Sequence, residues 1–488
     1  MKCKMPQSLR HPLLRALPYI RLLLFSPQQV AFRFYQLLLR NQNAENILRM
    51  RLIVLLCLIL LKSGSFAQPG KSSRHSKGSI RFYCDYFAYV HFGVQSTGKY
   101  IFCGSTGRDD DADIFVSRYN QDGTEDESFG KKGIMHMDLA GYKDVPVFIK
   151  ILPGDKVLIG AIADNAYSYR TMKGNMMLIR LNADGSPDTQ YGELGKVTEK
   201  PDRRYKGLMA ASISNEGNTY LLRRYDFRNQ FDFGVTGYGA DGKLLDNFGN
   251  NGNFNGSIRR FDDNGMDICL QPDGRILVTG QSHSGPSDVA IAARHNPVDV
   301  YLARFNADGS PDNDFAGNGK IVTDRGSARH TPKRVCITSE GRILVAGSVS
   351  NSRKQSDVFV YAFNTNGHPD TLFAARGVMR LRYSSSDQGA DMIVSPDGKF
   401  YVAGSLTRGN DPYAFVARFN EDGSVDTSFN KKGQVVMDYI SAQPQVLLQP
   451  DGKVLLGALA TIDRRNYYVL TRILPNGHLD ASFGQKSE

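Results

Sequence analysis

Apolar and polar residues follow a short repeated pattern along most of this chain. In the unit 267–324, DICLQ alternates apolar and polar residues, RILVTG is nearly all apolar, and VYLARF and KIVTD follow. Period-two alternation is typical of a half-buried strand, and a short apolar run is consistent with a strand covered on both faces. Pro-Asp-Gly at 272–274 separates the first two runs and indicates a hairpin. We predict four strands and no helix in each unit.

The same unit occurs seven times, at intervals of 54 to 67 residues. An aromatic residue follows the turn glycine by six positions in every copy. A regular period of this length requires each unit to bury its apolar face against a neighbour, and all-β units with glycine-rich turns favour a propeller. A β-solenoid is the main competitor, but its coils are usually much shorter. We predict an all-β, seven-bladed β-propeller of four-stranded blades over residues 78–488, with turn glycines at Gly123, Gly185, Gly242, Gly309, Gly367, Gly423 and Gly477.

The ends of the repeat array predict how the ring closes. The last unit stops at Glu488 without a fourth strand, and KGSIRFYCD at 77–85 resembles KKGIMHMD at 131–138. We therefore expect an N-terminal strand, about 78–84, to complete the last blade by pairing with the blade that holds residues 472–474. Such pairing removes an open sheet edge that would invite aggregation.

The N-terminal region has the features of a targeting signal. Residues 50–67 combine a basic start, the apolar run LIVLLCLILL and a small-x-small end, which is typical of a signal peptide cut before Gln68. A membrane anchor is the rival interpretation, but the run is about half of the ~20 residues that a spanning helix needs. We expect no transmembrane span in the mature chain, a linker at 68–77, and a secreted, periplasmic or cell-surface location.

Residues 1–49 precede this signal and are rich in arginine and leucine. They are interpreted as a non-native or disordered extension, with translation starting at Met50, or alternatively as a membrane-surface segment that starts at Met1. The choice of start also decides the charge. The chain carries a net charge of +11, but residues 1–67 hold 10 Lys and Arg and one acid, which leaves +2 for the remainder. A nucleic-acid partner is therefore not expected.

Four cysteines follow the signal, namely Cys84, Cys103, Cys269 and Cys336, and none has C-x-x-C spacing. We interpret them as small buried residues rather than as zinc ligands or redox groups. In an exported protein a disulfide is the alternative, and Cys84 with Cys103 is the pair we would expect.

The two recurring motifs, P-D-G-[KR]-[IV]-L-V-[AT]-G and R-F-N-x-D-G-S-x-D-x-[SD]-F-G, resemble the delta-60 repeat. The resemblance covers about residues 78–488 and implies a propeller fold and an exported bacterial protein. It implies no reaction, ligand or catalytic residue. Copy three departs most from the pattern, with SNEGNTYLLRR in place of the first motif and Leu245 in place of an aspartate, so a distorted third blade is expected.

The N-x-D-G turns offer oxygen atoms to a cation, as with Asn306, Asp308 and Asp312 in copy four. Calcium takes six to eight oxygens, and each turn has two or three candidates. Asx turns account for the same residues, because their side-chain oxygens cap backbone N–H groups. We expect no metal and no cofactor. No H-E-x-x-H or G-x-S-x-G motif is present, and no catalytic residue is assigned.

Two long loops, 161–175 and 281–299, stand out from the near-constant spacing of the other copies. Loops over a rigid scaffold often carry function, although neutral drift accounts for such insertions equally well. Our binding candidates are Tyr167, Tyr169, Arg170, His283, Arg294 and His295. We predict an exported, non-enzymatic scaffold that presents these loops to an unknown protein or glycan. The alternative is a polysaccharide hydrolase or lyase with its site at the propeller channel, an assignment that rests on analogy of fold.

Overall fold

The described part of the chain is built of β-strands. The computed structural model describes residues 72–76, 78–83, 90–106, 112–139, 143–164, 175–199, 205–227, 230–285, 297–323, 328–351 and 355–484. These residues form 29 strands and two short 3-10 turns, Pro153–Asp155 and Phe315–Gly317. Within these ranges no helix is long and apolar enough to cross a membrane.

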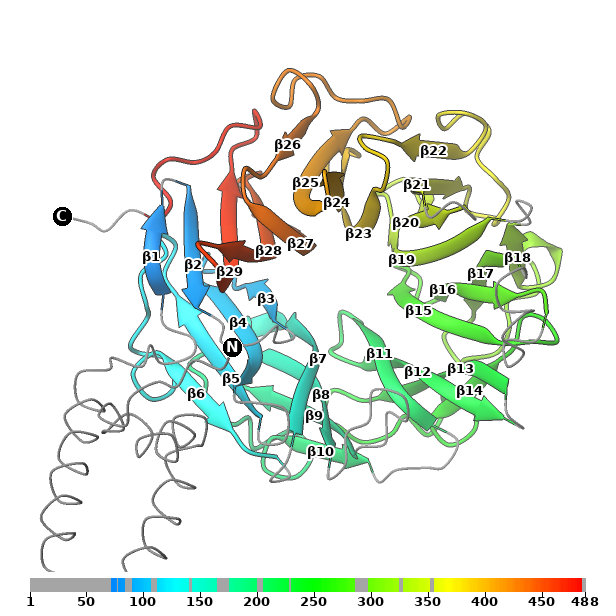
Figure 1. Ribbon diagram of the computed structural model, residues 1–488. Helices are drawn as coiled ribbons and strands as arrows, with labels where there is room; N and C mark the ends of the chain where they lie inside the picture. The colour runs from blue at the N-terminus through cyan, green and yellow to red at the C-terminus, as the bar shows by residue number, and fades with distance from the viewer. Residues whose placement is uncertain are drawn as a thin grey trace, which may run out of the picture. The chain divides into compact units, whose positions relative to one another are not determined.

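Each repeat folds as an antiparallel sheet of four consecutive strands, with the first strand nearest the central axis and the fourth outermost (Figure 1). The strands are β3 (His91–Val94), β4 (Tyr100–Thr106), β5 (Asp113–Tyr119), β6 (Ile134–Met137); β7 (Lys143–Ile151), β8 (Val157–Asp164), β9 (Asn175–Leu181), β10 (Lys196–Glu199); β11 (Tyr205–Ile213), β12 (Thr219–Phe227), β13 (Gln230–Tyr238), β14 (Asn253–Gly256); β15 (Asp263–Leu270), β16 (Ile276–His283), β17 (Val298–Phe305), β18 (Lys320–Thr323); β19 (Arg329–Ile337), β20 (Ile343–Ser350), β21 (Ser356–Phe363), β22 (Val378–Leu381); β23 (Gln388–Val394), β24 (Phe400–Arg408), β25 (Asp411–Phe419), β26 (Gln434–Val436); and β27 (Ile440–Leu448), β28 (Val454–Ile462), β29 (Arg465–Ile473) with β2 (Ser79–Tyr83) and β1 (Ser72–Ser76).

The number of sheets differs from the number of repeats. Hydrogen bonding divides the described strands into six sheets, one of which contains eight strands, β15 to β22. That sheet holds two successive repeats, because a single parallel bridge between Val298 and Arg329 joins β17 to β19. The structure confirms an all-β propeller of four-stranded blades, but the sheets are not the seven separate ones that the repeats predicted. A bridge formed between two repeats cannot be seen in the pattern within one repeat.

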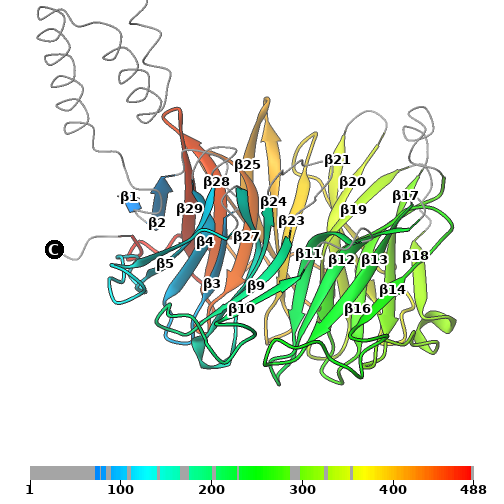
Figure 2. The same cartoon turned by 90° about the horizontal axis from the view of Figure 1, so that it is seen from below.

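Apolar cores lie between neighbouring sheets, which pack face to face around the axis (Figure 2). One core joins Ile101 and Val116 of β4 and β5 to Ile159 and Ile179 of β8 and β9, and all four side chains are at most 2% exposed. Middle strands are therefore covered on both faces, which accounts for their nearly continuous apolar sequence.

The N-terminal strand completes the last blade as the spacing predicts. β2 pairs antiparallel with β29, with Ser79 opposite Thr471. Ile80 is fully buried, and the Phe82 ring lies 4.2 Å from the Phe102 ring in the next blade. The two ends of the repeat array are thus held by both backbone pairing and apolar packing.

The predicted linker 68–77 is partly strand. β1 pairs with β2 along the outer edge of the last sheet and makes it five-stranded. Gly78 has a φ of 82°, which lets the chain reverse tightly so that Ser76 and Ser79 face each other. Residues 72–76 of the predicted linker thus form a strand, because the outer edge of β2 offers unpaired backbone groups to the chain that precedes it.

The repeated arginine and aromatic residues link one blade to the next. In copy four, Arg304 Nε donates to Asp312 Oδ2 at 2.7 Å, and Nη1 donates to the carbonyl of Thr365 in the following repeat at 2.6 Å. The guanidinium lies 4.4 Å from the centre of the Phe315 ring. A Cβ on Gly367, whose φ is 84°, would come within 2.7 Å of that ring. The glycine is needed both for the turn and for this close approach.

Two copies depart from this link. Copy three has Gly237 and Leu245 at the arginine and aspartate positions, yet it retains four paired strands, β11 to β14. Copy five has Ala362 instead of the arginine, and Arg342 from the preceding hairpin binds Asp370 at 2.7 Å in its place. The link therefore requires a guanidinium near the turn aspartate. An arginine either on the third strand of the repeat, as Arg304, or at the first hairpin, as Arg342, can supply this guanidinium.

The turn aspartates act as Asx caps, which confirms that interpretation of the N-x-D-G motif. Asp184 Oδ1 accepts the Ser186 N–H at 2.9 Å, and Asp308 Oδ1 accepts the Ser310 N–H at the same distance. Each oxygen also accepts the serine hydroxyl, at 2.7 Å. These hydrogen bonds lower the pKa of both carboxyls and stabilise the turn.

The described cysteines are free thiols in apolar surroundings. Cys103 is fully buried, whereas Cys269 and Cys336 are partly buried. Burial raises the pKa of the Cys269 thiol to about 12, so it stays protonated. Cys84, the predicted disulfide partner of Cys103, lies outside the described residues.

Candidate functional site

The innermost strands contain a β-bulge at an equivalent place in successive repeats. Register shifts occur on β7, β11, β15, β19, β23 and β27. The residues that follow these six bulges line a pocket on the axis, together with one residue of the innermost strand β3. We call these residues the inner ring: His91, Phe148, Ala210, Asp267, Arg334, Asp391 and Gln445. A bulge redirects a side chain, and here it directs one from each repeat toward the axis.

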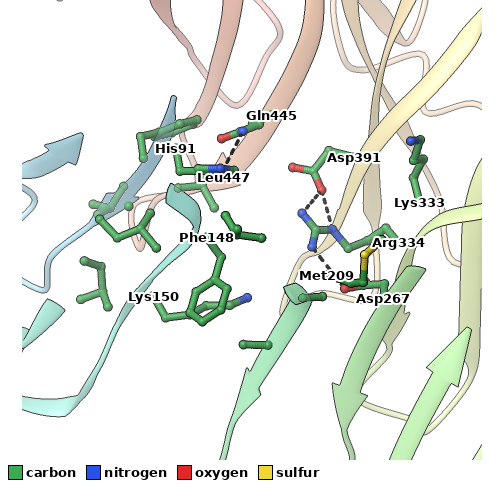
Figure 3. Close-up of a pocket in the computed structure, with 18 of the residues that line it drawn as sticks. His91, Phe148, Lys150, Met209, Asp267, Lys333, Arg334, Asp391, Gln445 and Leu447 are labelled. Atoms are coloured by element: carbon green, nitrogen blue, oxygen red, sulfur yellow. Dashed lines mark hydrogen bonds and ion pairs between the residues drawn. The ribbon is translucent and has the colours of Figure 1, made fainter. Parts of the chain in front are cut away.

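The pocket formed by the inner ring has a volume of about 460 Å³ (Figure 3). Most of its charged residues lie on β15, β19 and β23, whereas Phe148 with Met209 and Ala210 forms an apolar wall on β7 and β11, where Lys150 is the one charged lining residue. A pocket with a few placed polar groups and an apolar wall suits a small ligand or one end of a longer one.

The charged wall is a chain of three residues from three successive repeats. Arg334 donates from Nε to Asp391 Oδ1 at 2.6 Å, and its Nη1 lies 3.6 Å from Asp267 Oδ1. The other oxygen of each aspartate accepts a backbone N–H of the next innermost strand, Val335 at 2.8 Å and Val446 at 2.9 Å. The Asp391 carboxylate raises the pKa of Arg334, which stays charged. Both aspartates hold the ring together, and both are already occupied.

Two lysines line this pocket, the exposed Lys333 on β19 and Lys150 on β7. Lys150 is the cation on the strand of the apolar wall. The structure assigns its ammonium group no hydrogen bond or ion pair with the described residues, and the side chain lies beside Phe148 (Figure 3). Burial lowers the pKa of Lys150, and the Arg334 charge lowers it further. An anion placed here would favour the charged form of the lysine.

The remaining polar pair of the ring is neutral. Gln445 Nε2 donates to the Val90 carbonyl at 3.1 Å and lies 3.4 Å from His91 Nδ1. Burial lowers the pKa of His91 to about 4, so the imidazole is uncharged near neutral pH. It can accept or donate a hydrogen bond to a ligand without bringing a charge.

Of the binding residues predicted from the loops, the structure describes His283. It ends β16, its side chain is 9% exposed, and its backbone N–H donates to the Asp262 carbonyl at 3.0 Å. Burial lowers the pKa of His283 as well. The other candidates lie outside the described residues, namely Tyr167, Tyr169, Arg170, Arg294 and His295.

The fold and the pocket define this chain as a β-propeller of repeated four-stranded units with an axial site. Six segments match the family described as "Domain of unknown function (DUF5122) beta-propeller", at residues 95–129, 271–292, 294–315, 338–373, 395–429 and 449–483. The repeats are therefore similar to a β-propeller repeat family. No curated protein matches the sequence.

Solved structures resemble the chain at the level of fold. An ulvan lyase of polysaccharide lyase family PL25, bound to -[GlcA(1-4)Rha3S]-, has a TM-score of 0.50 at 13% identity, over 81% of this chain and 96% of the lyase. Drosophila Semaphorin 2a has a TM-score of 0.46 at 10% identity, over 83% of this chain and 76% of the semaphorin. A protein of unknown function from Dyadobacter fermentans has a TM-score of 0.40 at 10% identity, over 82% and 97% of the two chains.

Proposed function

We propose that this protein is an exported, non-enzymatic binding scaffold of seven propeller repeats whose axial pocket binds an acidic glycan. The observation that carries the proposal is the ammonium of Lys150, which has no direct ion pair among the described residues and lines the pocket beside Phe148. Export is supported by the signal-like segment 50–67 and by the resemblance to the delta-60 repeat.

The two residues suit the two faces of an acidic sugar. A uronate carboxylate would pair with Lys150 in a site largely removed from water, where such a hydrogen bond is stronger than at the surface. The apolar C–H face of the sugar would pack on the Phe148 ring. Asp267 and Asp391 would not repel the carboxylate strongly, because both are paired with Arg334.

Calorimetric titration with oligogalacturonate, and with a neutral oligosaccharide of the same length, tests this proposal. We expect the acidic ligand alone to bind. Lys150→Met keeps the aliphatic stem, and loss of about 1.4 kcal/mol of ion pairing would weaken binding tenfold. Lys243→Met is the matched control, because the Lys243 side chain is 85% exposed and far from the ring in the sequence. Equal binding of the neutral ligand, or wild-type binding by Lys150→Met, would refute the proposal.

The long loops 161–175 and 281–299 remain predicted contacts for a larger partner. In this proposal a glycan chain that enters the axial pocket would also reach those loops. Replacing Tyr167 and Tyr169 by serine should then weaken binding of long oligosaccharides more than binding of a disaccharide. Equal effects on both lengths would leave the axial pocket as the whole site.

A second candidate is an enzyme that cleaves acidic polysaccharide at the same pocket. Burial lowers the pKa of Lys150 and lowers that of His91 to about 4, so His91 is uncharged near neutral pH and is a candidate general base. A lyase needs a base next to a cation that neutralises the uronate carboxylate, and Arg334 lies in the same pocket. Appearance of an unsaturated product in the ultraviolet, lost in Lys150→Met, would establish the enzyme instead of the scaffold.

A further inference from the structure

A second site of concentrated charge lies away from the axial pocket, where the β3–β6 sheet meets the β7–β10 sheet. Asp113 begins β5, Asp138 follows β6, and Asp144 lies on β7. One carboxylate oxygen of each lies within 4.8 Å of those of the other two. A parallel bridge between Ala112 and Lys143 holds the strands together, and the Asp144 N–H donates to the Ala112 carbonyl at 2.7 Å.

The buried member of this cluster has an oxygen without a partner. Asp144 is fully buried, and its Oδ2 accepts the Leu139 N–H at 2.6 Å. Its Oδ1 is buried and has no hydrogen bond among the described residues. Burial and the charges of Asp138 and Asp113 together raise the pKa of Asp144 to about 6, against the lowering effect of the Leu139 hydrogen bond and of Lys196. A buried carboxylate oxygen with no donor requires a proton or a cation.

The same frame recurs between the β19–β22 and β23–β26 sheets, where it contains an arginine. Asp357 occupies the position of Asp113, and Asp387 that of Asp144. A parallel bridge between Ser356 and Ser386 and a bond of 2.8 Å from the Asp387 N–H to the Ser356 carbonyl repeat the contacts seen at Asp144.

The position of Asp138 is taken in that second frame by Arg382. Its Nε and Nη2 bind the two oxygens of Asp357 at 2.7 Å each. One frame therefore combines two acids with a cationic side chain, whereas the other has three acids. The first frame therefore has a carboxylate, Asp138, at the position from which Arg382 brings a positive charge to the second.

We propose that Asp113, Asp138 and Asp144 bind a calcium ion, which takes the place that the Arg382 guanidinium has in the related frame. Hard cations prefer carboxylate oxygens, and Ca²⁺ binds them at about 2.3–2.6 Å. Oxygens on opposite sides of a Ca²⁺ ion are then about 5 Å apart, which agrees with the spread of 4.8 Å. Mg²⁺, with bonds of about 2.0–2.1 Å, would require a tighter cluster. The ion would tie two neighbouring sheets together.

Calorimetric titration of the EDTA-treated full chain with CaCl₂, with MgCl₂ as comparison, tests this site. We expect one Ca²⁺ per chain, weaker Mg²⁺ binding, and a Ca²⁺-dependent rise in Tm. Asp144→Asn should weaken Ca²⁺ binding at least tenfold. Asp387→Asn is the matched control, because it alters the equivalent residue of the arginine-containing frame and should leave Ca²⁺ binding unchanged.

Asp138→Arg provides an independent test that does not depend on removing a buried group, because Asp138 is exposed. It should convert the three-acid frame to the arginine type, abolish Ca²⁺ binding and make Tm independent of EDTA. The proposal is overturned if wild-type protein shows no Ca²⁺ binding at millimolar concentration. It is equally overturned if Asp138→Arg and Asp144→Asn both bind Ca²⁺ like the wild type.

Discussion

Replacing Arg304 by methionine tests the buried link between neighbouring blades. Arg304 is 5% exposed and makes two short hydrogen bonds, to Asp312 within its repeat and to the Thr365 carbonyl in the next. Hydrogen bonds to charged groups each stabilise a fold by about 1.5–3 kcal/mol. Asp312 retains a second partner, Arg275 Nε at 3.4 Å, which offsets part of the loss. We expect the free energy of unfolding to fall by about 3 kcal/mol.

Urea unfolding measures this loss, followed by tyrosine fluorescence and circular dichroism, since the chain has no tryptophan. Lys243→Met is the control, because Lys243 and Asp241 form an exposed ion pair at 3.3 Å. Such surface pairs contribute about 0–1 kcal/mol. Arg304→Met with Asp312→Asn should be more stable than Arg304→Met alone, because the second change removes a buried carboxylate that has lost its closest partner.

Two results would refute this account of the link. The first is an equal shift of the unfolding midpoint in Arg304→Met and Lys243→Met at unchanged slope. The second concerns the double variant. It would be less stable than Arg304→Met by as much as Asp312→Asn alone is less stable than the wild type. The first result would mean that the buried link contributes no more than an exposed ion pair. The second would mean that the guanidinium and the carboxylate act independently, as residues without a shared contact do.

Three further changes test the closure, the turns and the buried acids. Ile80→Ala should reduce the free energy of unfolding by about 2–5 kcal/mol, because Ile80 is fully buried in the closing strand; a loss below 1 kcal/mol in urea would show that β2 adds little. Gly367→Ala should lower Tm by more than Gly317→Ala, since both glycines have positive φ but only a Cβ at 367 would meet the Phe315 ring; equal shifts in calorimetry would contradict this packing. Burial and neighbouring carboxylates raise the pKa of Asp232 to about 7, so the folded state holds a proton that the unfolded state releases near pH 4. Stability should therefore decrease between pH 4 and 7 more steeply in the wild type than in Asp232→Asn, and parallel urea midpoints across that range would contradict the shift.

The fold was largely predictable because its signals are local. The glycine of each Asp-Gly turn needs a positive φ, and the aromatic residue six positions later packs on the glycine of the next repeat, as Phe315 does on Gly367. Closure was also predictable, because the segment around Ile80 resembles a fourth strand. The bridge from Val298 to Arg329 depends on how two repeats approach each other, and no pattern within a repeat contains that information.

The residues of the axial pocket were not predicted, although the alternative hypothesis placed a site at the propeller channel and the sequence contains a signal for these residues. Asp267, Arg334 and Asp391 each stand seven residues before the turn glycine of their repeat, so they occupy equivalent positions. Their charges nevertheless differ in sign, which distinguishes this position from the conserved pattern of the repeat. Alternation alone does not say which face of the innermost strand meets the axis, and the bulge that decides it leaves no mark in the composition. Variable loop length was a more visible feature and drew the prediction toward the loops.

The pairing of β2 with β29 has a consequence for biosynthesis. Ser79 is made early and its partner Thr471 almost last, so the ring cannot close until nearly the whole chain has been translated. At about 5–20 residues per second this delay is roughly 20–80 s. During that time β2 can pair with β1 on one edge, but the edge that will join β29 has unpaired hydrogen-bonding groups, which exposes the nascent chain to misassociation. A circular permutant with β2 placed after β29 would make closure a local hairpin and remove the delay.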